Sequence, residues 1–371
     1  MKRKHSNRPS VATTHSRRRF LKGALGTAAL LQAPAFIRNS GASKLRKVKF
    51  QLAWIPSGEY TPWFAAKEMG VWSDLGLDVE ISRGFGSGKT AKNVSLGQFD
   101  VGEASFGLVA NTASKGGPLV ALAARYQKSP VGIMALTKKG LKKPKDLEGM
   151  TVGSAAFSGA YRLFPAFAKA TKLDASKVKF QMISPAAYFS SLLAGKVDAL
   201  ATYYVSQAPP LLAKDIPFDF LFFADYQLDM LDQTLITRPD SLKKDRELYR
   251  NFVRGALKGV AFSYLNPQKT VDIAMKQLAA LGFGKGSRRN VELAKGVATA
   301  LGISDAVEKR GIGWMEPALV KATVDKVVTY LGANKIDDLD ALYTNEFVGG
   351  VNLKPEQWAK LRAESKKYLP S

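Results

Sequence analysis

Apolar and polar residues alternate in short runs along the first third of the chain. Residues 48–55 and 77–81 have the pattern of strands, and residues 61–70 and 90–96 have the spacing of helices. A Gly-x-x-Asp joint at 97–100 then leads into a third apolar strand. The pattern predicts a β-α-β-α-β unit, in which helices join parallel strands.

The same order of elements recurs about 100 residues later. Strands are predicted at 151–153 and 178–183, with helices after Ser158 and from 185 to 194. A second Gly-x-x-Asp joint at 195–198 leads into the next strand. We therefore predict two similar βαβαβ halves, and open α/β sheets of this kind bind ligands at the carboxyl ends of their strands.

The chain crosses between the two halves twice. An apolar strand at 130–136, followed by a lysine-rich stretch at 138–145, indicates the crossing into the second half, and residues 233–237 are the predicted return strand. We expect the helical segments beyond it to pack on the first half: 242–264, 267–281, 291–301, 317–331 and 355–368. The predicted domains are a discontinuous first lobe at 46–137 plus 233–371 and a second lobe at 138–232.

Much of the positive charge lies at the N-terminus. The 371 residues have a formal net charge of +24, and residues 1–35 contain eight Lys or Arg and no Asp or Glu. Residues 16–22 resemble a twin-arginine export signal, a short apolar run follows, and Ala33-Pro34-Ala35 is a triplet that a signal peptidase accepts. We expect residues 1–35 to be a signal peptide, cleaved after Ala35 or Ala42, and the protein to reach the periplasm by the twin-arginine route.

A basic arm that binds nucleic acid is the alternative for this segment, but the cleavage triplet favours export, and we expect no nucleic-acid partner. Both histidines, His5 and His15, lie in the predicted leader, and the chain has no cysteine. The mature chain then lacks the side chains that most often perform acid–base, nucleophilic and transition-metal chemistry. We predict no catalytic residue, no metal site and no cofactor, and a soluble protein outside the cytoplasm.

Four segments resemble those of a known family: 64–70 with 75–80, 97–100, 145–149 and 343–347. Through them residues 46–360 resemble the periplasmic solute-binding proteins of ABC importers, in the family of the sulfonate, nitrate and thiamine-pyrimidine-precursor binders and the fungal pyrimidine synthases. The resemblance implies an α/β, two-lobed Venus-flytrap fold (type II), with βαβαβ lobes joined by a two-strand hinge. It also implies a monomer that closes on one small molecule and delivers it to a membrane permease.

Two functional classes follow from this resemblance. The first is an exported binding component that captures a small aromatic or anionic solute containing nitrogen or sulfur. The second is an enzyme like the pyrimidine synthases, which consume a histidine and pyridoxal phosphate and have a cysteine-rich cluster. The absence of cysteine and the position of both histidines disfavour the enzyme.

The candidate ligand residues are aromatic, hydroxyl, acidic and basic residues in the loops that follow the predicted strands. They are Trp54, Glu59, Tyr60, Trp63, Ser87, Glu103, Ser105, Phe157, Ser158, Gly159, Tyr161, Arg162 and Tyr203. Aromatic residues beside polar ones suit a flat ring that is stacked and held by hydrogen bonds. Ser87 and Ser158 precede helix starts, where free N–H groups favour an anionic or carbonyl group.

The charged candidates point to different ligands. Arg162, or Arg125 at the end of an earlier strand, would hold a sulfonate or carboxylate. Glu59 and Glu103 would instead suit the amino groups of a pyrimidine. The sequence leaves this choice open.

Overall fold

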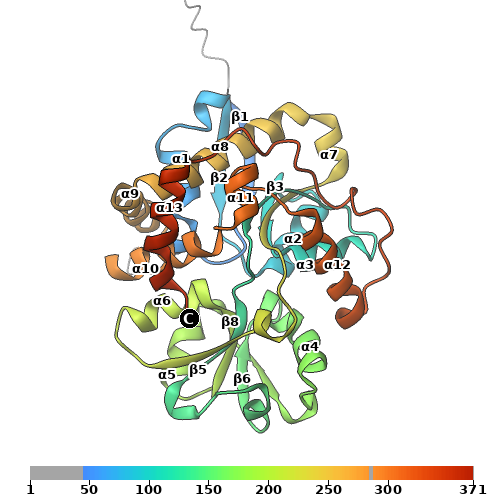
Figure 1. The fold of residues 1–371 in the computed structure, drawn as a ribbon, viewed down its shortest axis with the longest axis vertical. Coiled ribbons are helices and arrows are strands. Elements are labelled where there is room, and N and C mark those ends of the chain that lie inside the picture. Colours follow the sequence, from blue (N-terminus) through green and yellow to red (C-terminus); the bar gives the residue numbers. More distant parts are fainter. Residues whose placement is uncertain (1–44, 284–286, 371) are drawn as a thin grey trace, which may run out of the picture. The chain divides into compact units, whose positions relative to one another are not determined.

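The computed structural model describes residues 45–283 and 287–370, which form two mixed β-sheets with surrounding helices (Figure 1). The predicted twin-arginine leader and both proposed cleavage positions lie outside the described residues. No helix within the described ranges is both long and apolar enough to span a bilayer.

The first sheet has the strand order β2-β1-β3-β10-β4. Its strands are β1 (Arg46–Gln51), β2 (Leu77–Ser82), β3 (Val101–Ala104), β4 (Val120–Tyr126) and β10 (Asp232–Thr237). β1 pairs in parallel with β2 and β3, whereas β10 runs antiparallel between β3 and β4. Helices α1 (Thr61–Glu68) and α2 (Ser87–Ser95) connect the parallel strands, and α3 (Phe106–Ala113) follows β3. The predicted βαβαβ unit is confirmed here.

The second sheet repeats this arrangement, with the order β7-β6-β8-β5-β9. Its strands are β5 (Val131–Leu136), β6 (Thr151–Ser154), β7 (Lys179–Met182), β8 (Ala199–Tyr203) and β9 (Phe218–Phe222). β6 pairs in parallel with β7 and β8, and β5 runs antiparallel between β8 and β9. Helices α4 (Gly159–Thr171) and α5 (Tyr188–Leu193) connect the parallel strands, and α6 (Tyr204–Leu212) follows β8.

The position of β5 corrects one predicted boundary. Residues 131–137 were assigned to the first lobe, but all six residues of β5 are buried in the second sheet. The chain therefore crosses before residue 131, and the lysine-rich stretch at 138–145 is a surface turn after the strand rather than the crossing. The breakers Gly140 and Pro144 belong to that turn.

Most of the remaining helices follow β10. They are α7 (Pro239–Lys244), α8 (Arg246–Leu265), α9 (Pro267–Ala280), α10 (Arg288–Leu301), α11 (Asp305–Arg310), α12 (Pro317–Leu331) and α13 (Pro355–Ser365). The predicted helix at 242–264 is two helices, because the Asp245 side chain accepts a hydrogen bond from the Leu248 N–H and begins α8. α8 and α9 pack on α1, as expected, while α10 packs both on the turn Gly58–Tyr60 of the first half and on α6, and α12 packs on both α3 and α4.

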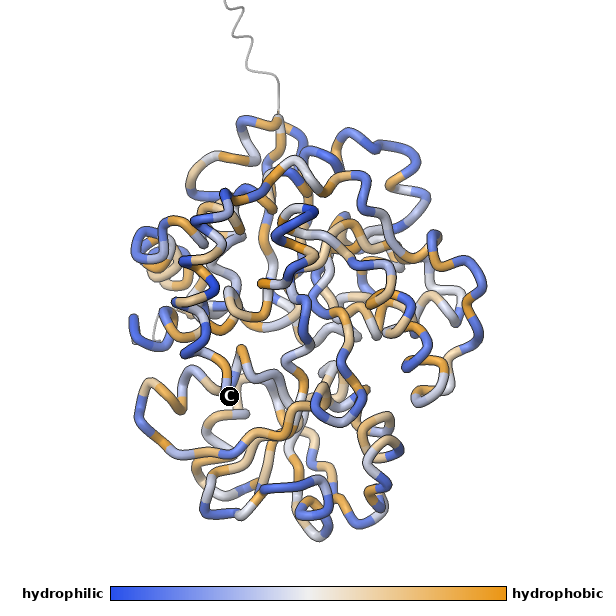
Figure 2. The backbone as a smooth tube through the Cα atoms, viewed as in Figure 1, coloured by the Kyte–Doolittle hydropathy of each residue, from blue (hydrophilic) through white to orange (hydrophobic). Residues whose placement is uncertain are grey.

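Each sheet has its own apolar core. In the first, the Trp72 ring stacks on Phe252 with centroids 5.4 Å apart, and in the second the Phe167 ring stacks on Phe223 at 4.3 Å. Figure 2 shows hydrophobic stretches along the strands and hydrophilic ones along outer helices and loops. Between the cores the two crossings meet, because the Ser129 hydroxyl donates to Asp232 Oδ2 at 2.5 Å.

Candidate ligand cleft

A small cavity lies between the two sheets, at the carboxyl ends of their strands. The first sheet and its loops line it with Ala53, Trp54, Glu59, Tyr60, Gly86, Ser87 and Gln233, and the second with Ser158, Gly159, Thr202, Tyr203 and Ser206. Its volume is about 20 Å³, which is enough for one water molecule. The structure is thus closed on this site, and a larger solute enters only when the sheets separate.

Two helix N-termini face each other across the cavity. Gly86 precedes α2 with a φ of 121°, and a Cβ there would lie 2.3 Å from the Phe157 carbonyl oxygen, just before α4. The Gly88 N–H donates to that same oxygen at 3.2 Å. Glycine therefore permits the close approach of the two helix starts. The first N–H groups of a helix have no intrahelical partner, so both ends present donors and partial positive charge to the site.

Several buried polar atoms converge on the cavity without a partner. The Trp54 Nε1, the Tyr60 and Tyr203 hydroxyls and Gln233 Oε1 make no hydrogen bond of normal geometry with any described residue. The hydroxyl of Ser105, directly behind the cavity, is also unpartnered. Buried polar groups are nearly always paired, so a cluster of exceptions from both sheets is the pattern of a polar binding site.

Gln233 also has a strained backbone. Its φ is 49°, in the left-handed region that side chains other than Gly, Asn and Asp seldom adopt, although it lies within β10. The register of β10 against β4 passes from Asp232 opposite Tyr126 to Thr234 opposite Ala124. The Asp232 side chain accepts from the Gln233 N–H at 2.7 Å and supports this geometry. Strain of this kind gathers at functional sites, because only a specific requirement keeps it.

An ion pair lies behind the cavity floor. Arg125 Nε donates to Glu103 Oε1 at 2.5 Å, and both side chains are almost fully buried. Arg125 Nη1 donates to the Glu59 carbonyl at 2.6 Å, and Trp63 Nε1 donates to Glu103 Oε2 at 3.1 Å. The guanidinium also lies over the Tyr126 ring, 4.3 Å from its centroid. The protein thus holds Arg125 through Nε and Nη1, whereas Nη2 has no hydrogen-bond partner among the described residues, and Arg125 does not line the cavity.

Burial dominates the titration of the acidic groups. It raises the pKa of Glu59 to about 7, although the Arg125 charge opposes this, and it raises the pKa of Asp232 to about 6. Burial also raises the pKa of Glu103, which Arg125 counteracts. Three carboxyl groups accompany one guanidinium in this region. The site is therefore rich in acceptors and does not carry the surplus of positive charge that would hold an anion.

The structure separates the candidate ligand residues into three groups. Those that line the cavity are Trp54, Glu59, Tyr60, Ser87, Ser158, Gly159 and Tyr203. Glu103 and Ser105 are buried just behind it, and Trp63 lies in the core of the first sheet, edge-on to Phe50. The remaining three lie outside the lining. The Phe157 side chain is 38% exposed, Tyr161 packs edge-on against Phe180, and the exposed Arg162 lies over the Phe157 ring.

Sequence reasoning missed Thr202, Ser206 and Gln233 as lining residues. Ser206 lies in the first turn of α6, a helix that was not predicted, and its hydroxyl donates to Glu59 Oε1 at 3.2 Å, across the two halves. Thr202 directly precedes the predicted Tyr203, so its strand position was a usable signal. Nothing in the sequence indicates the left-handed backbone of Gln233.

A second, larger groove adjoins the cavity and shares Trp54 and Ser206 with it. Its volume is about 230 Å³, and its other lining residues are mostly apolar: Ile55, Pro56, Ser57, Gly58, Pro185, Ala186, Phe189, Gln207, Pro210, Leu278, Phe283, Asn290, Val291 and Ala294. The groove extends the site from its polar end into an apolar space.

Residues 57–270 match the model of the family described as NMT1/THI5 like. The chain belongs to the NMT1/THI5-like family. Among named relatives, the riboflavin-binding protein RibY of Chloroflexus aurantiacus is 20% identical over 82% of this chain and 87% of its own length. The formylaminopyrimidine-binding protein of Halalkalibacterium halodurans is 24% identical over 62% of this chain and 70% of its own.

Solved structures show which fold this is. The alkanesulfonate-binding protein SsuA of Xanthomonas axonopodis matches with a TM-score of 0.60 at 12% identity, over 81% of this chain and 99% of its own. The periplasmic nitrate-binding protein NrtA of Synechocystis matches with a TM-score of 0.59 at 12% identity, over 88% and 92%. The chain has the periplasmic binding protein fold, as the resemblance implied, and these relatives are binding proteins for chemically different solutes.

Proposed function

We propose that this protein is the solute-binding component of an ABC import system and that its ligand occupies the cleft between the two sheets. The observation that carries the proposal is the set of unpartnered buried polar atoms contributed by both sheets to one cavity. A ligand that pairs with these atoms contacts both halves at once. It therefore stabilises the closed arrangement, which is how binding becomes a conformational signal.

The ligand that best fits these groups is a planar nitrogen heterocycle with both donors and acceptors. Glu59 and Gln233 Oε1 accept hydrogen bonds, whereas Trp54 Nε1 and the two helix N-termini donate them. An anion is less suitable, because neither Arg125 nor Arg162 lines the cavity, whereas Glu59 does. Of the two sets of charged candidates, the structure supports the acidic one. The adjacent apolar groove would take a substituent on the ring.

We also propose that the two halves move as lobes, with the first made of residues 45–130 and 232–370 and the second of residues 131–231. Ser206 to Glu59 and Gly88 to Phe157 are hydrogen bonds that join the halves beside the cavity. Opening would break these bonds and the Arg289–Asp215 ion pair, would separate α10 from α6 and α12 from α4, and would admit the solute. Closure then requires a ligand with a few kcal/mol of preference for the closed state.

The proposal includes export to the periplasm by the twin-arginine leader, delivery to a membrane permease and a role as a binder rather than an enzyme. The family and the named relatives support a binding role, and the sequence of residues 16–22 supports the export route. Replacing Arg17 and Arg18 by Lys should retain the full-length precursor in the cytoplasm, which cell fractionation measures. Unchanged export of that variant would contradict the route.

The test of the binding role is a ligand screen by thermal shift and tryptophan fluorescence, since Trp54 lines the cavity. Aminopyrimidines, flavins, aryl- and alkylsulfonates and nitrate form the panel. We expect a heterocycle with N–H donors to raise the melting temperature and change the fluorescence, and nitrate and sulfonates to have no effect. A sulfonate or nitrate as the tightest ligand would overturn the proposed ligand class, and chemical turnover of a bound compound would overturn the binding role.

A further inference from the structure

A separate groove lies on the other side of the first sheet's helices, away from the cleft lining. Its volume is about 430 Å³. Residues from α8, α9, α10, α13 and the turn that follows α13 line it: Tyr264, Pro267, Gln268, Val271, Glu292, Lys295, Gly296, Thr299, Leu361, Glu364, Ser365, Lys367 and Tyr368. It shares no lining residue with the cleft cavity or with the apolar groove beside it.

Lys295 is the unusual residue of this groove. Its side chain belongs to α10 and the residue is only 7% exposed. Its ammonium group forms no hydrogen bond or ion pair with any described residue. The backbone carbonyl of Lys295 accepts a hydrogen bond from the Thr299 hydroxyl. Lysine is almost never buried without a partner, because an unpaired charge loses its hydration. Burial therefore lowers the pKa of Lys295 to about 8.

Among the acidic residues of the groove, the charge of Glu364 raises the pKa of Lys295, but by less than burial lowers it, and no acidic residue forms an ion pair with Lys295 among the described residues. Glu292 pairs with Arg288 at 2.9 Å, and Glu364 lies 3.9 Å from Lys360, so each has another cation nearby. Lys367 adds a second positive charge to the lining. The groove thus presents one cation whose side chain is nearly buried and which forms no hydrogen bond or ion pair with any residue that the structure describes.

The walls beside Lys295 suit a flat apolar body. The Tyr368 ring lies directly against α10 at Gly296, where a Cβ would come within 2.4 Å of it. Tyr264, Val271 and Leu361 are the other large apolar or aromatic lining residues, and all three are buried in the core of the first sheet. An aromatic ring with one anionic substituent would match both the walls and the charge.

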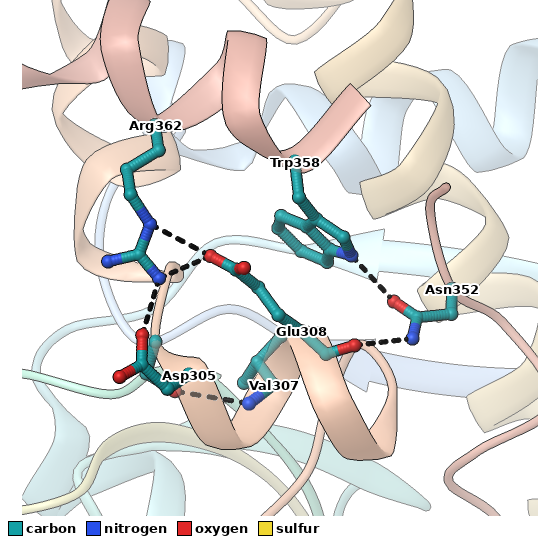
Figure 3. A network of polar contacts seen from close by, with 7 residues as sticks. Asp305, Val307, Glu308, Asn352, Trp358 and Arg362 are labelled. Carbon is teal, nitrogen blue, oxygen red and sulfur yellow. Dashed lines mark hydrogen bonds and ion pairs between the residues drawn. The ribbon is translucent and has the colours of Figure 1, made fainter. Parts of the chain in front are cut away.

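One wall of the groove is fixed by a polar network that Figure 3 shows. Arg362 of α13 donates to Asp305 Oδ1 at 2.7 Å and to Glu308 Oε1 at 2.9 Å, both on α11. Trp358 Nε1 donates to Asn352 Oδ1 at 2.9 Å, and Asn352 Nδ2 donates to the Glu308 carbonyl at the same distance. These bonds anchor α13, which supplies Leu361, Glu364 and Ser365 to the groove.

We infer that this Lys295 groove is a second ligand site, distinct from the transport cleft, which binds a small aromatic carboxylate with the ammonium of Lys295 as its anion partner. The ring lies between Tyr264 and Tyr368, and the carboxylate replaces the water that burial removes from the lysine. The site does not depend on the identity of the transported solute.

Titration calorimetry of the purified full chain with benzoate tests this inference, with benzamide as the uncharged analogue. We expect benzoate to bind and benzamide not to. Lys295→Met should weaken benzoate binding at least tenfold, and Lys295→Arg, which keeps the charge, should restore most of it. Lys269→Met, an exposed lysine on α9 outside the lining, is the matched control and should bind benzoate like the original chain.

Two further measurements separate this groove from the cleft. Gln233→Ala, which alters the cleft, should leave benzoate binding unchanged, and circular dichroism checks that every variant is folded. Absence of benzoate binding to the original chain, or undiminished binding to folded Lys295→Met, would overturn the inference. Loss of binding in Gln233→Ala alone would place benzoate in the cleft and would also overturn it.

Discussion

The cleft and the Lys295 groove differ in how their buried charged side chains are paired. In the cleft, Arg125, Glu103 and Glu59 form an interlocked group in which each side chain or carbonyl is held by another. In the groove, Lys295 lies nearly buried with no such partner. The cleft is nearly filled, at about 20 Å³, whereas the groove is open, at about 430 Å³. In the first region the Arg125 guanidinium forms an ion pair with Glu103, whereas in the second Lys295 forms no ion pair with a described residue.

The largest expected effect comes from breaking the compensated pair. Arg125→Met leaves Glu103 buried without its cation, so the free energy of unfolding should fall by about 3–5 kcal/mol. Urea denaturation measures the loss. Arg46→Met is the matched control, because it breaks an exposed ion pair with Asp245 and should cost about 1 kcal/mol or less. Equal losses in the two variants would show that burial does not distinguish these pairs.

The second expected effect is a change in how the free energy of unfolding depends on pH. The pKa of Glu59 is about 7 in the folded protein against 4.5 as its ordinary value, so the folded state binds this proton more tightly. The stability from this group is full below about pH 4.5 and is lost as the pH rises through about 7. Glu59→Gln removes this loss. Between pH 4.5 and pH 8, the free energy of unfolding of the variant should therefore rise relative to that of the original chain by up to about 3 kcal/mol. Parallel stability profiles of the two chains would contradict the raised pKa.

A third change separates strain from binding within the cleft. Gln233→Gly relieves the left-handed backbone and should raise the free energy of unfolding by up to about 1 kcal/mol. It also removes a polar contact, so affinity for the solute found by the screen should fall about tenfold. Gln227→Gly is the matched control, since Gln227 has a φ of 66° and is exposed outside the cleft. It should give the stability gain alone, and a loss of solute affinity there would mean that the effect is indirect.

The smallest expected effect lies in the groove. Lys295→Met removes an uncompensated charge and should raise the free energy of unfolding by about 1 kcal/mol at pH 7. The gain should shrink between pH 8 and 10.5, because the folded protein then holds Lys295 without its proton, whereas the unfolded chain keeps the proton until about pH 10.5. Thermal unfolding across this pH range measures it. Destabilisation at pH 7 would show that Lys295 has a partner in the folded protein.

Much of the fold follows from local patterns in the sequence. The two βαβαβ units were predictable because their parallel strands are short apolar runs separated by helices with clear start and stop residues, and α12 was predicted at its observed bounds, Pro317–Leu331. β5 was assigned to the wrong half because the residues that end a strand do not reveal which sheet the strand joins. β9 was missed since nothing marks the aromatic run Phe218–Phe222 as an edge strand.

The site was predictable only as far as it depends on strand ends. Trp54, Ser87, Ser158 and Tyr203 follow strands and line the cavity. Arg162 lies one turn into α4, on the side of the helix that faces solvent. The short loop before α4 does not predict which side of the helix each residue faces. Gln233 enters the cavity from a distant return strand through a backbone conformation that no local pattern predicts.

If the two halves move as proposed, the hydrogen bond from Ser129 to Asp232 would restrict how they can turn. Ser129 lies on the outgoing crossing and Asp232 at the beginning of the return strand, so one bond couples both connections. Two separate linkers would allow the halves to twist, slide and tilt independently. When two linkers are joined at one point, the halves can rotate essentially about one axis only. Every opening should then follow the same path, and every closure should return the same residues into contact.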